Sequence, residues 1–484
     1  MSEPIPFRSA SELAGMIRER AIGAQDLLEL HLERVDRLNP ELNAIVVQDR
    51  EAARRRAREA DEALAQGRVW GPLHGVPITV KESFDVAGLP STWGEPAFRD
   101  NRPERDSVAV QRLREAGAVL FGKTNVPLML ADWQTYNAIY GTTHNPWARG
   151  RTPGGSSGGS AAALASGMTA FEIGSDIGAS IRNPAHFCGV FGHKPSWGIV
   201  PYTGHLLPGL RDEPDLTVAG PLARSAADLT LGLDILAGAA GKAATAWRLE
   251  LPPPRAARLE NLRIAVMLES AVSEVDRAYR AVLEKLVGDL EAQGARIERA
   301  RPGFDDWDHH QTYMNLLRAV TTARQPWATF ERALEVRRNL ADADRSYSAM
   351  VTRGTTLYHR EWVAEHEKRL AFQAQWAAFF ERYDVLLCPA AASAAFPQDE
   401  ARPREERRIP VNGREVDYND QLYWAGIATA SLLPSTVAPA GLTADGLPTG
   451  VQIIGPHLED RTPLAMARLI EAIRPFTPPP GLAA

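Results

Sequence analysis

The chain has 484 residues, of which 44% are hydrophobic and 24% charged, a composition that excludes a disordered or fibrous protein. The formal net charge of −6 provides no positive field for nucleic acid or an anionic membrane, so neither is expected as a partner. Two cysteines, Cys188 and Cys388, are too few for a disulfide framework or a thiolate zinc site, which favours a reducing, cytoplasmic location.

Residues 1–70 are predicted to form N-terminal helices. Apolar residues recur at helical spacing over Ser11–Leu38 and stop at Asn39-Pro40, and Glu51–Gln66 is rich in Ala, Arg and Glu. The N-terminus lacks the charged-then-apolar pattern of a secretion signal. No run of about 18 uncharged apolar residues occurs, so no membrane-spanning helix is expected.

Residues 71–300 are predicted to form an α/β core, because short apolar runs alternate with amphipathic segments. The expected strands and helices are a strand at Val76–Val80 that ends at Lys81, a helix at Ser107–Ala116, strands at Ala118–Phe121 and Leu262–Leu268, and a helix at Asp276–Gln293.

Residues 305–408 are predicted to form a helical insertion or cap over one side of a cleft. The part from Asp305 to Tyr383 is aromatic, charged and helical in period, with no strand candidate. Its tryptophans suit a bulky substrate; they are Trp307, Trp327, Trp362 and Trp376.

The remaining segments are predicted to return to the same core. Asp384–Pro389 is a strand candidate, and Val437–Gly455 is a hairpin candidate with its turn at Asp445-Gly446. Residues 409–484 would complete the core, so the chain 1–484 is interpreted as one domain.

Three short motifs have weaker interpretations. Gly117–Thr124 matches the P-loop pattern, but its intervening residues are apolar and fit a buried strand better than a phosphate-binding loop. Gly155–Gly159 matches the G-x-S-x-G pattern, which leaves Ser157 with Asp384 and His457 as a weak alternative triad, although no strand precedes it.

A third cluster consists of His186, Cys188 and His193. No carboxylate with ligand spacing accompanies these residues, so structural roles are favoured over a metal or thiol site.

The segment Pro153–Pro184 contains the strongest chemical signal. Two loops rich in glycine and serine flank an alanine-rich stretch, and glycine allows a backbone to approach a ligand closely. Serine hydroxyls and free backbone N–H groups are what acyl transfer requires. A base is also required, and Lys81 could serve if burial lowers its pKa, although an exposed strand-end lysine is the simpler interpretation of that stretch alone.

This segment strongly resembles the amidase signature family, serine hydrolases with a Ser–cis-Ser–Lys triad. The pattern GGSSGG…GSDIG-x-SIR-x-P is long and specific. Similar stretches occur over most of the chain, except in 305–408: Gly75–Ser83, Gly122–Asn125, Tyr140–Trp147, Ala219–Arg224 and Gly446–Gln452. The resemblance implies the amidase signature fold, a large mixed sheet flanked by helices on both faces.

The resemblance also assigns roles to individual residues. It implies Ser180 as nucleophile, Ser156 as the serine of a cis peptide, and Lys81 as base. The oxyanion hole would use the backbone N–H groups of Ile177, Gly178, Ala179 and Ser180. Ser157, Asp176 and Arg182 would hold the loops rather than react, with Asp176 and Arg182 as a pair.

One position departs from the family pattern. Ala179 stands where the family usually has glycine, directly before the nucleophile. Alanine still supplies an N–H group but adds a methyl group and restricts the backbone. We expect an effect on substrate scope rather than loss of activity.

The leading functional hypothesis is metal-independent and cofactor-independent hydrolysis of a C–N acyl bond. An amide, anilide or carbamate (urethane) of small to medium size and mostly apolar character would form a Ser180 acyl-enzyme, with side activity on esters. The walls of the pocket are expected at 128–133 and 205–214. The enzyme would be a monomer or homodimer acting on a small molecule.

Two alternatives remain open. The chain could be the glutaminase (amidotransferase A-type) subunit of a tRNA-dependent transamidation complex. It could also be a non-catalytic binding module, although retention of Lys81, Ser156 and Ser180 argues against that.

Overall fold

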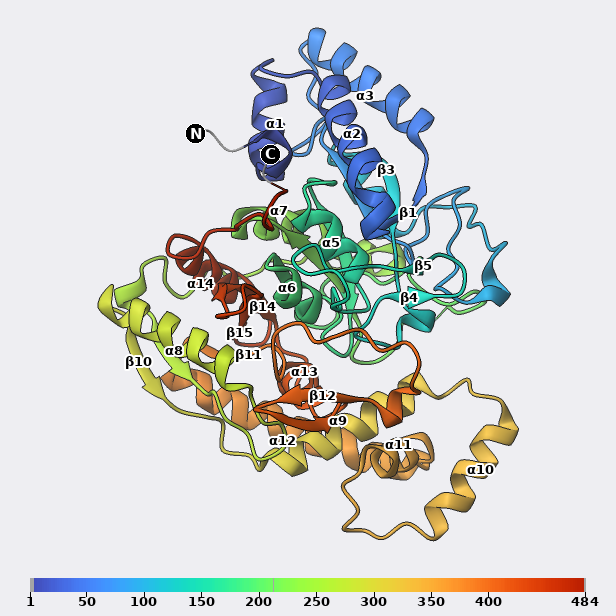
Figure 1. Cartoon of the computed structure of the whole chain (residues 1–484), viewed down its shortest axis with the longest axis vertical. Coiled ribbons are helices and arrows are strands. Elements are labelled where there is room, and N and C mark those ends of the chain that lie inside the picture. The colour runs from blue at the N-terminus through green and yellow to red at the C-terminus, as the bar shows by residue number, and fades with distance from the viewer. Residues whose placement is uncertain (1–3, 212, 483–484) are drawn as a thin grey trace.

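A central eight-stranded mixed sheet organises the molecule (Figure 1). The structure is a computed structural model that describes residues 4–211 and 213–482. In spatial order the strands are β10 (Arg296–Arg299), β9 (Arg263–Val266), β11 (Val385–Pro389), β15 (Pro448–Ile454), β14 (Ser435–Leu442), β7 (Phe191–Lys194), β8 (Val218–Ala223) and β6 (Glu172–Asp176). Strands β10, β9 and β11 are parallel, and every other neighbouring pair is antiparallel.

A three-stranded sheet lies beside the β6 edge. Its order is β1 (Ile45–Gln48), β3 (Val119–Thr124) and β2 (Pro77–Lys81), with β3 antiparallel to β1 and parallel to β2. Strand β2 runs next to β6, and the Ala170 N–H donates to the Pro77 carbonyl at 3.4 Å. The two sheets therefore bring Lys81, at the end of β2, to the end of β6.

Helices cover both faces of the main sheet, as predicted for the amidase signature fold. Helices α5 (Gly158–Ala165) and α6 (Arg182–Cys188) pack on one face, where a Cβ at Gly192 of β7 would meet Ile181 and Ala185. Helices α7 (Ala226–Leu236) and α14 (Arg461–Glu471) pack together on the other face. Helix α5 is buried at every position, because alanine and glycine allow close packing against strands and helices on all sides.

The N-terminal region contains three helices rather than the two predicted. They are α1 (Ala10–Arg18), α2 (Ala24–Leu42) and α3 (Arg50–Ala65). The predicted helix Ser11–Leu38 is broken after α1, where Arg20 adopts a left-handed φ of 58° and Gly23 caps α2. The predicted stop at Asn39-Pro40 is also wrong, since α2 includes Pro40 in its last turn.

Most other predicted elements are present. Helix α4 (Val108–Glu115) and helix α8 (Arg277–Ala292) match the predicted helices, and the predicted strand at 118–121 lies largely within β3. Strands β14 and β15 form the predicted hairpin, and Gly446 in its turn has a φ of 77°.

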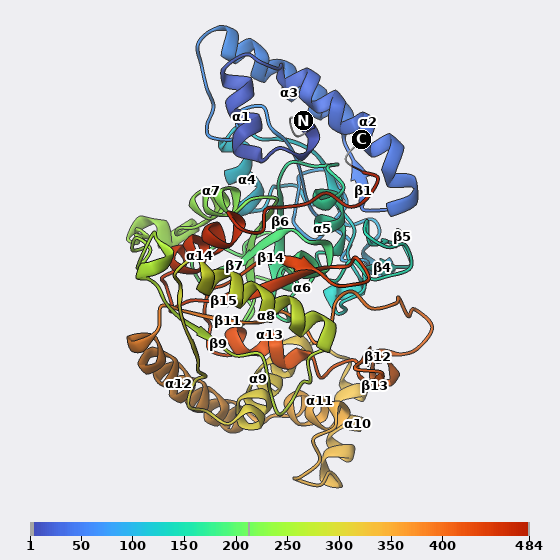
Figure 2. The ribbon, with the colours of Figure 1, turned by 60° about the vertical axis from the view of Figure 1, so that its left-hand side comes forward.

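Residues 305–382 form four helices at the end of the molecule opposite α1–α3 (Figures 1 and 2). These are α9 (Asp306–Thr321), α10 (Trp327–Arg338), α11 (Tyr347–Thr355) and α12 (His359–Arg382). Helix α9 packs against α11, α12 and α13 (Leu422–Thr429), whereas α10 has no buried residue. The chain then enters the main sheet through β11.

The remaining elements are short. They are the hairpins β4 (Tyr136–Asn137) with β5 (Gly141–Thr142) and β12 (Arg408–Val411) with β13 (Arg414–Asp417), and six 3₁₀ helices at Ile5–Phe7, Pro96–Phe98, Leu128–Leu130, Gly241–Thr245, Leu259–Asn261 and Arg404–Glu406.

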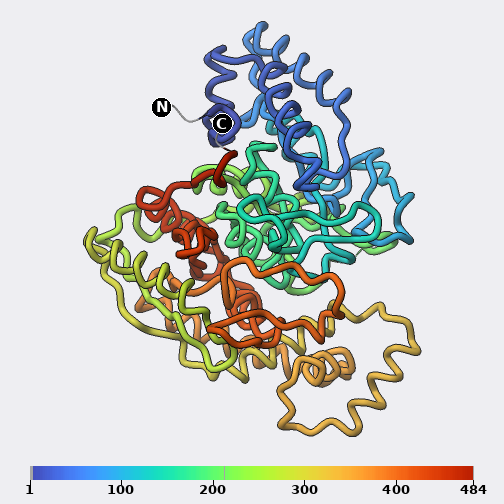
Figure 3. The backbone as a smooth tube through the Cα atoms, viewed as in Figure 1, coloured from blue at the N-terminus to red at the C-terminus, as the bar shows by residue number. Residues whose placement is uncertain are grey.

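The described part of the C-terminal segment returns to the N-terminal helices (Figure 3). The rings of Phe7 and Phe476 stack with centroids 6.1 Å apart. Within residues 4–211 and 213–482, no helix combines the length and apolar character needed to cross a bilayer.

Candidate active site

Lys81 and Ser156 meet in the interior between the two sheets. Lys81 is the last residue of β2, and its Nζ donates to Ser156 Oγ at 2.7 Å and to Ser175 Oγ at 2.9 Å. Ser156 precedes α5 and follows a cis Gly155–Ser156 peptide bond, as the resemblance implied. Lys81 is fully buried, whereas Ser180 retains 6% exposure. Among the described residues, the lysine is therefore held by two hydroxyls rather than by a carboxylate.

Burial changes the acid–base behaviour of Lys81. Loss of hydration lowers its pKa from 10.5 to about 7, because the charged ammonium is disfavoured away from water. The nearby carboxyl groups of Asp176 and Glu172 oppose this shift in part. A substantial fraction of the amine is then neutral near pH 7 and able to accept a proton.

Ser180 lies in a loop that leaves β6 and enters α6. The Ser180 carbonyl accepts a hydrogen bond from the Ser157 N–H at 3.1 Å, which joins the two serine-containing loops. The Asp176 carboxylate accepts from the backbone N–H groups of Ala179 at 3.0 Å and Ile181 at 3.1 Å. Asp176 therefore fixes the backbone on both sides of Ser180.

The predicted pair of Asp176 and Arg182 is present and completely buried. Arg182 Nη2 lies 2.8 Å from Asp176 Oδ1, and Nε lies 3.0 Å from Oδ2. Burial alone would raise the pKa of Asp176, but the charge and hydrogen bonds of Arg182 outweigh it and lower that pKa below its usual value. Arg182 also donates to Gln452 Oε1 at 2.6 Å and Thr429 Oγ1 at 2.8 Å, which ties the loop to β15 and α13.

Ala179 differs from the expectation for the oxyanion hole. Its N–H is directed to Asp176, so it is not available to a developing oxyanion. Its φ of 68° lies in the left-handed region, which costs an alanine about 1–2 kcal/mol and explains why glycine suits this position. The expectation that Ala179 contributes to the oxyanion hole is therefore wrong, and the N–H groups of Ile177, Gly178 and Ser180 remain as the predicted set.

Two aromatic residues hold the loop from outside: Tyr313, which the sequence did not single out, and Trp133, which lies in the stretch 128–133 expected to line the pocket. Tyr313 of α9 donates its hydroxyl to the Ile177 carbonyl at 3.0 Å, and Trp133 Nε1 donates to the Gly178 carbonyl at 2.7 Å. Ser175, the second partner of Lys81, lies within the sequence motif, which assigns it no role. Because Tyr313 meets the loop only in the folded chain, no local pattern marked it.

Replacing Tyr313 with phenylalanine is expected to lower the free energy of unfolding by about 1 kcal/mol, because the partly buried Ile177 carbonyl loses its donor. It should also lower kcat/KM several-fold through movement of the loop. Chemical denaturation and steady-state kinetics measure the two effects. Tyr279 gives a matched control, since its buried hydroxyl donates to the Gly450 carbonyl at 2.6 Å. A Tyr279→Phe variant should lose stability alone; equal losses of activity in both variants would contradict the role of Tyr313.

The alternative motifs do not assemble into sites. Residues 119–124 of the P-loop match are strand β3, as the sequence favoured. Ser157 begins α5, and Asp384 pairs with Arg263 at 2.6 Å. Among the described residues, neither Ser157 nor Asp384 has a hydrogen bond to His457.

The residues His186, Cys188 and His193 do not form a common site either. The two histidines bind different partners elsewhere in the fold. His186 Nε2 lies 2.9 Å from the Ser393 carbonyl, and His193 Nε2 lies 3.3 Å from Asp460 Oδ1. Burial raises the pKa of the Cys188 thiol, which disfavours a reactive thiolate. In the part of the chain that the structure describes, no three His, Cys, Asp or Glu side chains are grouped to hold a metal.

The four tryptophans expected to suit a bulky substrate contact other side chains or solvent. Trp376 is fully buried against Phe380, Trp327 is 69% exposed, and Trp362 stacks on His366 with centroids 5.4 Å apart. Trp307 lies beneath the Arg345 guanidinium at 4.7 Å. Helix α9 instead reaches the Ser180 loop through Tyr313.

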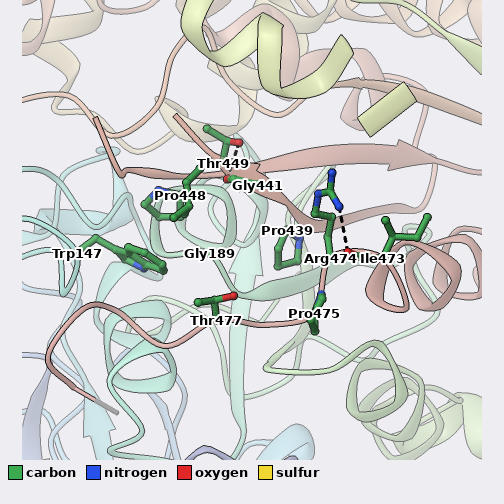
Figure 4. Close-up of a pocket in the computed structure, with 11 residues that line it drawn as sticks. Trp147, Gly189, Pro439, Gly441, Pro448, Thr449, Ile473, Arg474, Pro475 and Thr477 are labelled. Carbon is green, nitrogen blue, oxygen red and sulfur yellow. Dashed lines mark hydrogen bonds between the residues drawn. The ribbon is translucent and has the colours of Figure 1, made fainter. Parts of the chain in front are cut away.

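Two cavities lie away from Lys81, Ser156 and Ser180. One, of about 110 Å³, is lined by Trp147, Pro448 and Arg474, among others (Figure 4). The other, of about 350 Å³, is a surface groove beside Trp247 and Glu213. Neither is lined by Lys81, Ser156 or Ser180, so the buried serine–lysine cluster is the better candidate for chemistry.

Comparison with known proteins gives a consistent result. A family model described as Amidase matches residues 26–464. The chain is 33% identical over 480 residues to an acylamidase of Rhodococcus erythropolis, covering 97% of this chain and 96% of the relative. It is 30% identical over 486 residues to the A-type subunit of the glutamyl-tRNA(Gln) amidotransferase of Carboxydothermus hydrogenoformans, covering 96% and 97%. A crystal structure described as an amidase superposes with a TM-score of 0.77 at 28% identity, covering 96% of this chain and all of the other.

Proposed function

Because the chain belongs to the amidase signature family, we propose that it hydrolyses the C–N acyl bond of a small or medium-sized amide, anilide or carbamate through an acyl-enzyme on Ser180. The 2.7 Å contact between Lys81 Nζ and Ser156 Oγ carries this proposal, because a buried, partly neutral lysine beside a hydroxyl is a base with a proton relay.

The first half-reaction uses each group of the cluster. Ser180 Oγ attacks the carbonyl carbon while its proton passes through Ser156 to Lys81. The N–H groups of Ile177, Gly178 and Ser180 stabilise the negative charge that develops on the carbonyl oxygen. Ser156 then donates a proton to the departing nitrogen, which is a poor leaving group until it is protonated, and Lys81 returns its proton to Ser156.

The second half-reaction repeats the relay with water. Lys81 accepts a proton from the attacking water through Ser156 and returns it through Ser156 to Ser180 Oγ as the bond to the acyl carbon breaks. The product leaves as a carboxylic or carbamic acid, which then loses its own proton to water. Ser175 positions the amine through its 2.9 Å contact, and Ser157 joins the loops through its backbone. Esters should also react, because their leaving oxygen needs less help than nitrogen.

A stand-alone enzyme, monomeric or homodimeric, is the leading form of this proposal. The glutaminase subunit of a transamidation complex is the alternative, supported by 30% identity to the A-type amidotransferase chain over most of both sequences. Co-purification with partner subunits and activity restricted to glutamine would favour the alternative.

A panel of acyl anilides, primary amides, carbamates, esters and glutamine tests the proposal. The wild-type protein should hydrolyse at least one anilide, amide or carbamate, and Ser180→Ala should reduce that turnover to background. Turnover of glutamine alone would replace the leading form by the alternative. Full activity in Ser180→Ala would exclude Ser180 as the nucleophile.

A further inference from the structure

Two arginines lie together beside the candidate site without an acidic partner. Arg318 is on α9, and Arg404 begins the 3₁₀ helix after β11. Their guanidinium carbons lie 5.3 Å and 5.9 Å from the centre of the Tyr347 ring. Within residues 4–211 and 213–482, neither guanidinium lies within 4.0 Å of a carboxylate. Two cations therefore share one aromatic surface.

Both arginines have N–H groups that are not used in hydrogen bonds among the described residues. Arg318 Nη2 donates to the Tyr347 hydroxyl at 2.8 Å, while its buried Nε has no hydrogen-bond partner among the described residues. Arg404 Nε donates to Asn419 Oδ1 at 2.8 Å, and Nη1 donates to the Ala131 carbonyl. Each guanidinium has five N–H donors, so several remain for a ligand.

The charge around the pair is positive. Asp132 is the nearby carboxylate, but it is held by Arg407 Nη1 at 2.5 Å and by the Tyr418 hydroxyl at 2.5 Å. Asp132 is therefore ion-paired with Arg407, and although its charge also acts on Arg404, it forms no ion pair with Arg318 or Arg404. Like charges in a partly desolvated place repel each other, and an anion between them would relieve that repulsion.

The pair is connected to the loop of the nucleophile. Arg404 lies 5.1 Å over the ring of Trp133, whose Nε1 binds the Gly178 carbonyl. Arg318 is little more than one helical turn beyond Tyr313, whose hydroxyl binds the Ile177 carbonyl. Both arginines therefore lie near the aromatic side chains that hold the Ser180 loop, and the charges of both act on the Tyr313 hydroxyl.

We propose that Arg318 and Arg404 bind a carboxylate of the substrate, so that the preferred substrates are amides with a negatively charged group near the scissile bond. This inference rests on the proposed amidase function. The planar guanidinium group pairs with a carboxylate through two parallel hydrogen bonds, which gives orientation as well as affinity. The mostly apolar pocket expected from the sequence therefore has one charged wall.

Matched 4-nitroanilides test the inference on the acyl side. The mono-4-nitroanilide of succinic acid has a free carboxylate, and butyryl 4-nitroanilide is a neutral compound of similar length with the same leaving group. N-butyryl-4-aminobenzoate and N-butyrylaniline form the corresponding pair on the amine side. In at least one pair, the wild-type enzyme should have a kcat/KM about tenfold or more higher for the anionic substrate.

The variants Arg318→Gln and Arg404→Gln should each remove most of this preference by raising KM for the anionic substrate. The quantity compared is the ratio of kcat/KM for the anionic substrate to kcat/KM for the neutral substrate, whatever the rate for the neutral substrate. Because both rates are measured on one preparation, their ratio is independent of the folded fraction. Arg345→Gln is the matched control, since Arg345 is an exposed arginine that stacks on Trp307 outside this pair.

The outcomes separate the inference from the proposed function. Hydrolysis of neutral and anionic substrates at equal rates, or an unchanged preference in both variants, would overturn the carboxylate site and leave the amidase proposal intact. Failure to hydrolyse any amide, anilide, carbamate or ester would contradict the proposed function itself.

Discussion

Replacing Lys81 with methionine is expected to lower kcat/KM for amide hydrolysis by about 10²–10⁴-fold. Methionine fills nearly the same space but cannot accept a proton, so Ser156 would lose the base 2.7 Å from its hydroxyl. Folding should survive, because the substitution removes an amine that burial already disfavours in its charged form. Steady-state kinetics on the best substrate of the panel measure the loss.

The pH dependence of kcat/KM is a second measurement that tests Lys81 as the base. The proposed mechanism uses neutral Lys81, and burial lowers the pKa of this lysine to about 7. The wild-type kcat/KM should therefore fall about tenfold per pH unit below pH 7 and level off above it. Lys81→Met should lose this titration.

Lys194 provides a matched control for Lys81. It is also fully buried, burial also lowers its pKa to about 7, and its Nζ donates only to the Pro195 and Leu433 carbonyls among the described residues. A Lys194→Met variant should retain the pH profile and most of the activity. If the pH dependence disappeared in Lys194→Met and remained in Lys81→Met, the base would be Lys194 and the assignment of Lys81 would be wrong.

Replacing Arg182 with methionine is expected to lower the free energy of unfolding by about 3–5 kcal/mol. The variant leaves the Asp176 carboxylate buried at 0% side-chain exposure without its cation, and it removes donors to Gln452 and Thr429. Activity should fall as well, because Asp176 fixes the N–H groups of Ala179 and Ile181 beside the nucleophile. Denaturant unfolding gives the change in stability.

An exposed ion pair is the control for Arg182. Arg461 lies 2.7 Å from Asp234, with both side chains partly exposed, and Arg461→Met should cost no more than about 1 kcal/mol. A second variant, Asp176→Asn with Arg182→Met, should recover part of the lost stability by removing the unpaired charge. An Arg182→Met protein with wild-type stability and activity would show that the pair does not hold the loop.

The sequence was sufficient to predict the local parts of the site. The resemblance to the amidase signature family pointed to Lys81 beside Ser156, whereas the Lys81 stretch alone favoured an exposed lysine. The Asp176–Arg182 pair lies within one short segment. The hairpin of β14 and β15 was also predicted, because its turn requires a residue such as Gly446 with positive φ.

Features that depend on tertiary contacts were missed or misjudged. The break at Arg20 has no glycine or proline at the bend itself, and the apolar period continues across it. The direction of the Ala179 N–H depends on where the Asp176 carboxylate lies after the chain turns. Tyr313 comes from a segment more than 130 residues beyond the loop that it holds.

Covalent labelling with a fluorophosphonate tests the central claim most directly, because this reagent reacts with an activated serine hydroxyl. The account predicts one adduct per chain, located by mass spectrometry on Ser180, absent from Ser180→Ala and slowed strongly in Lys81→Met. An adduct on Ser157, or labelling of Ser180 at an unchanged rate in Lys81→Met, would contradict it.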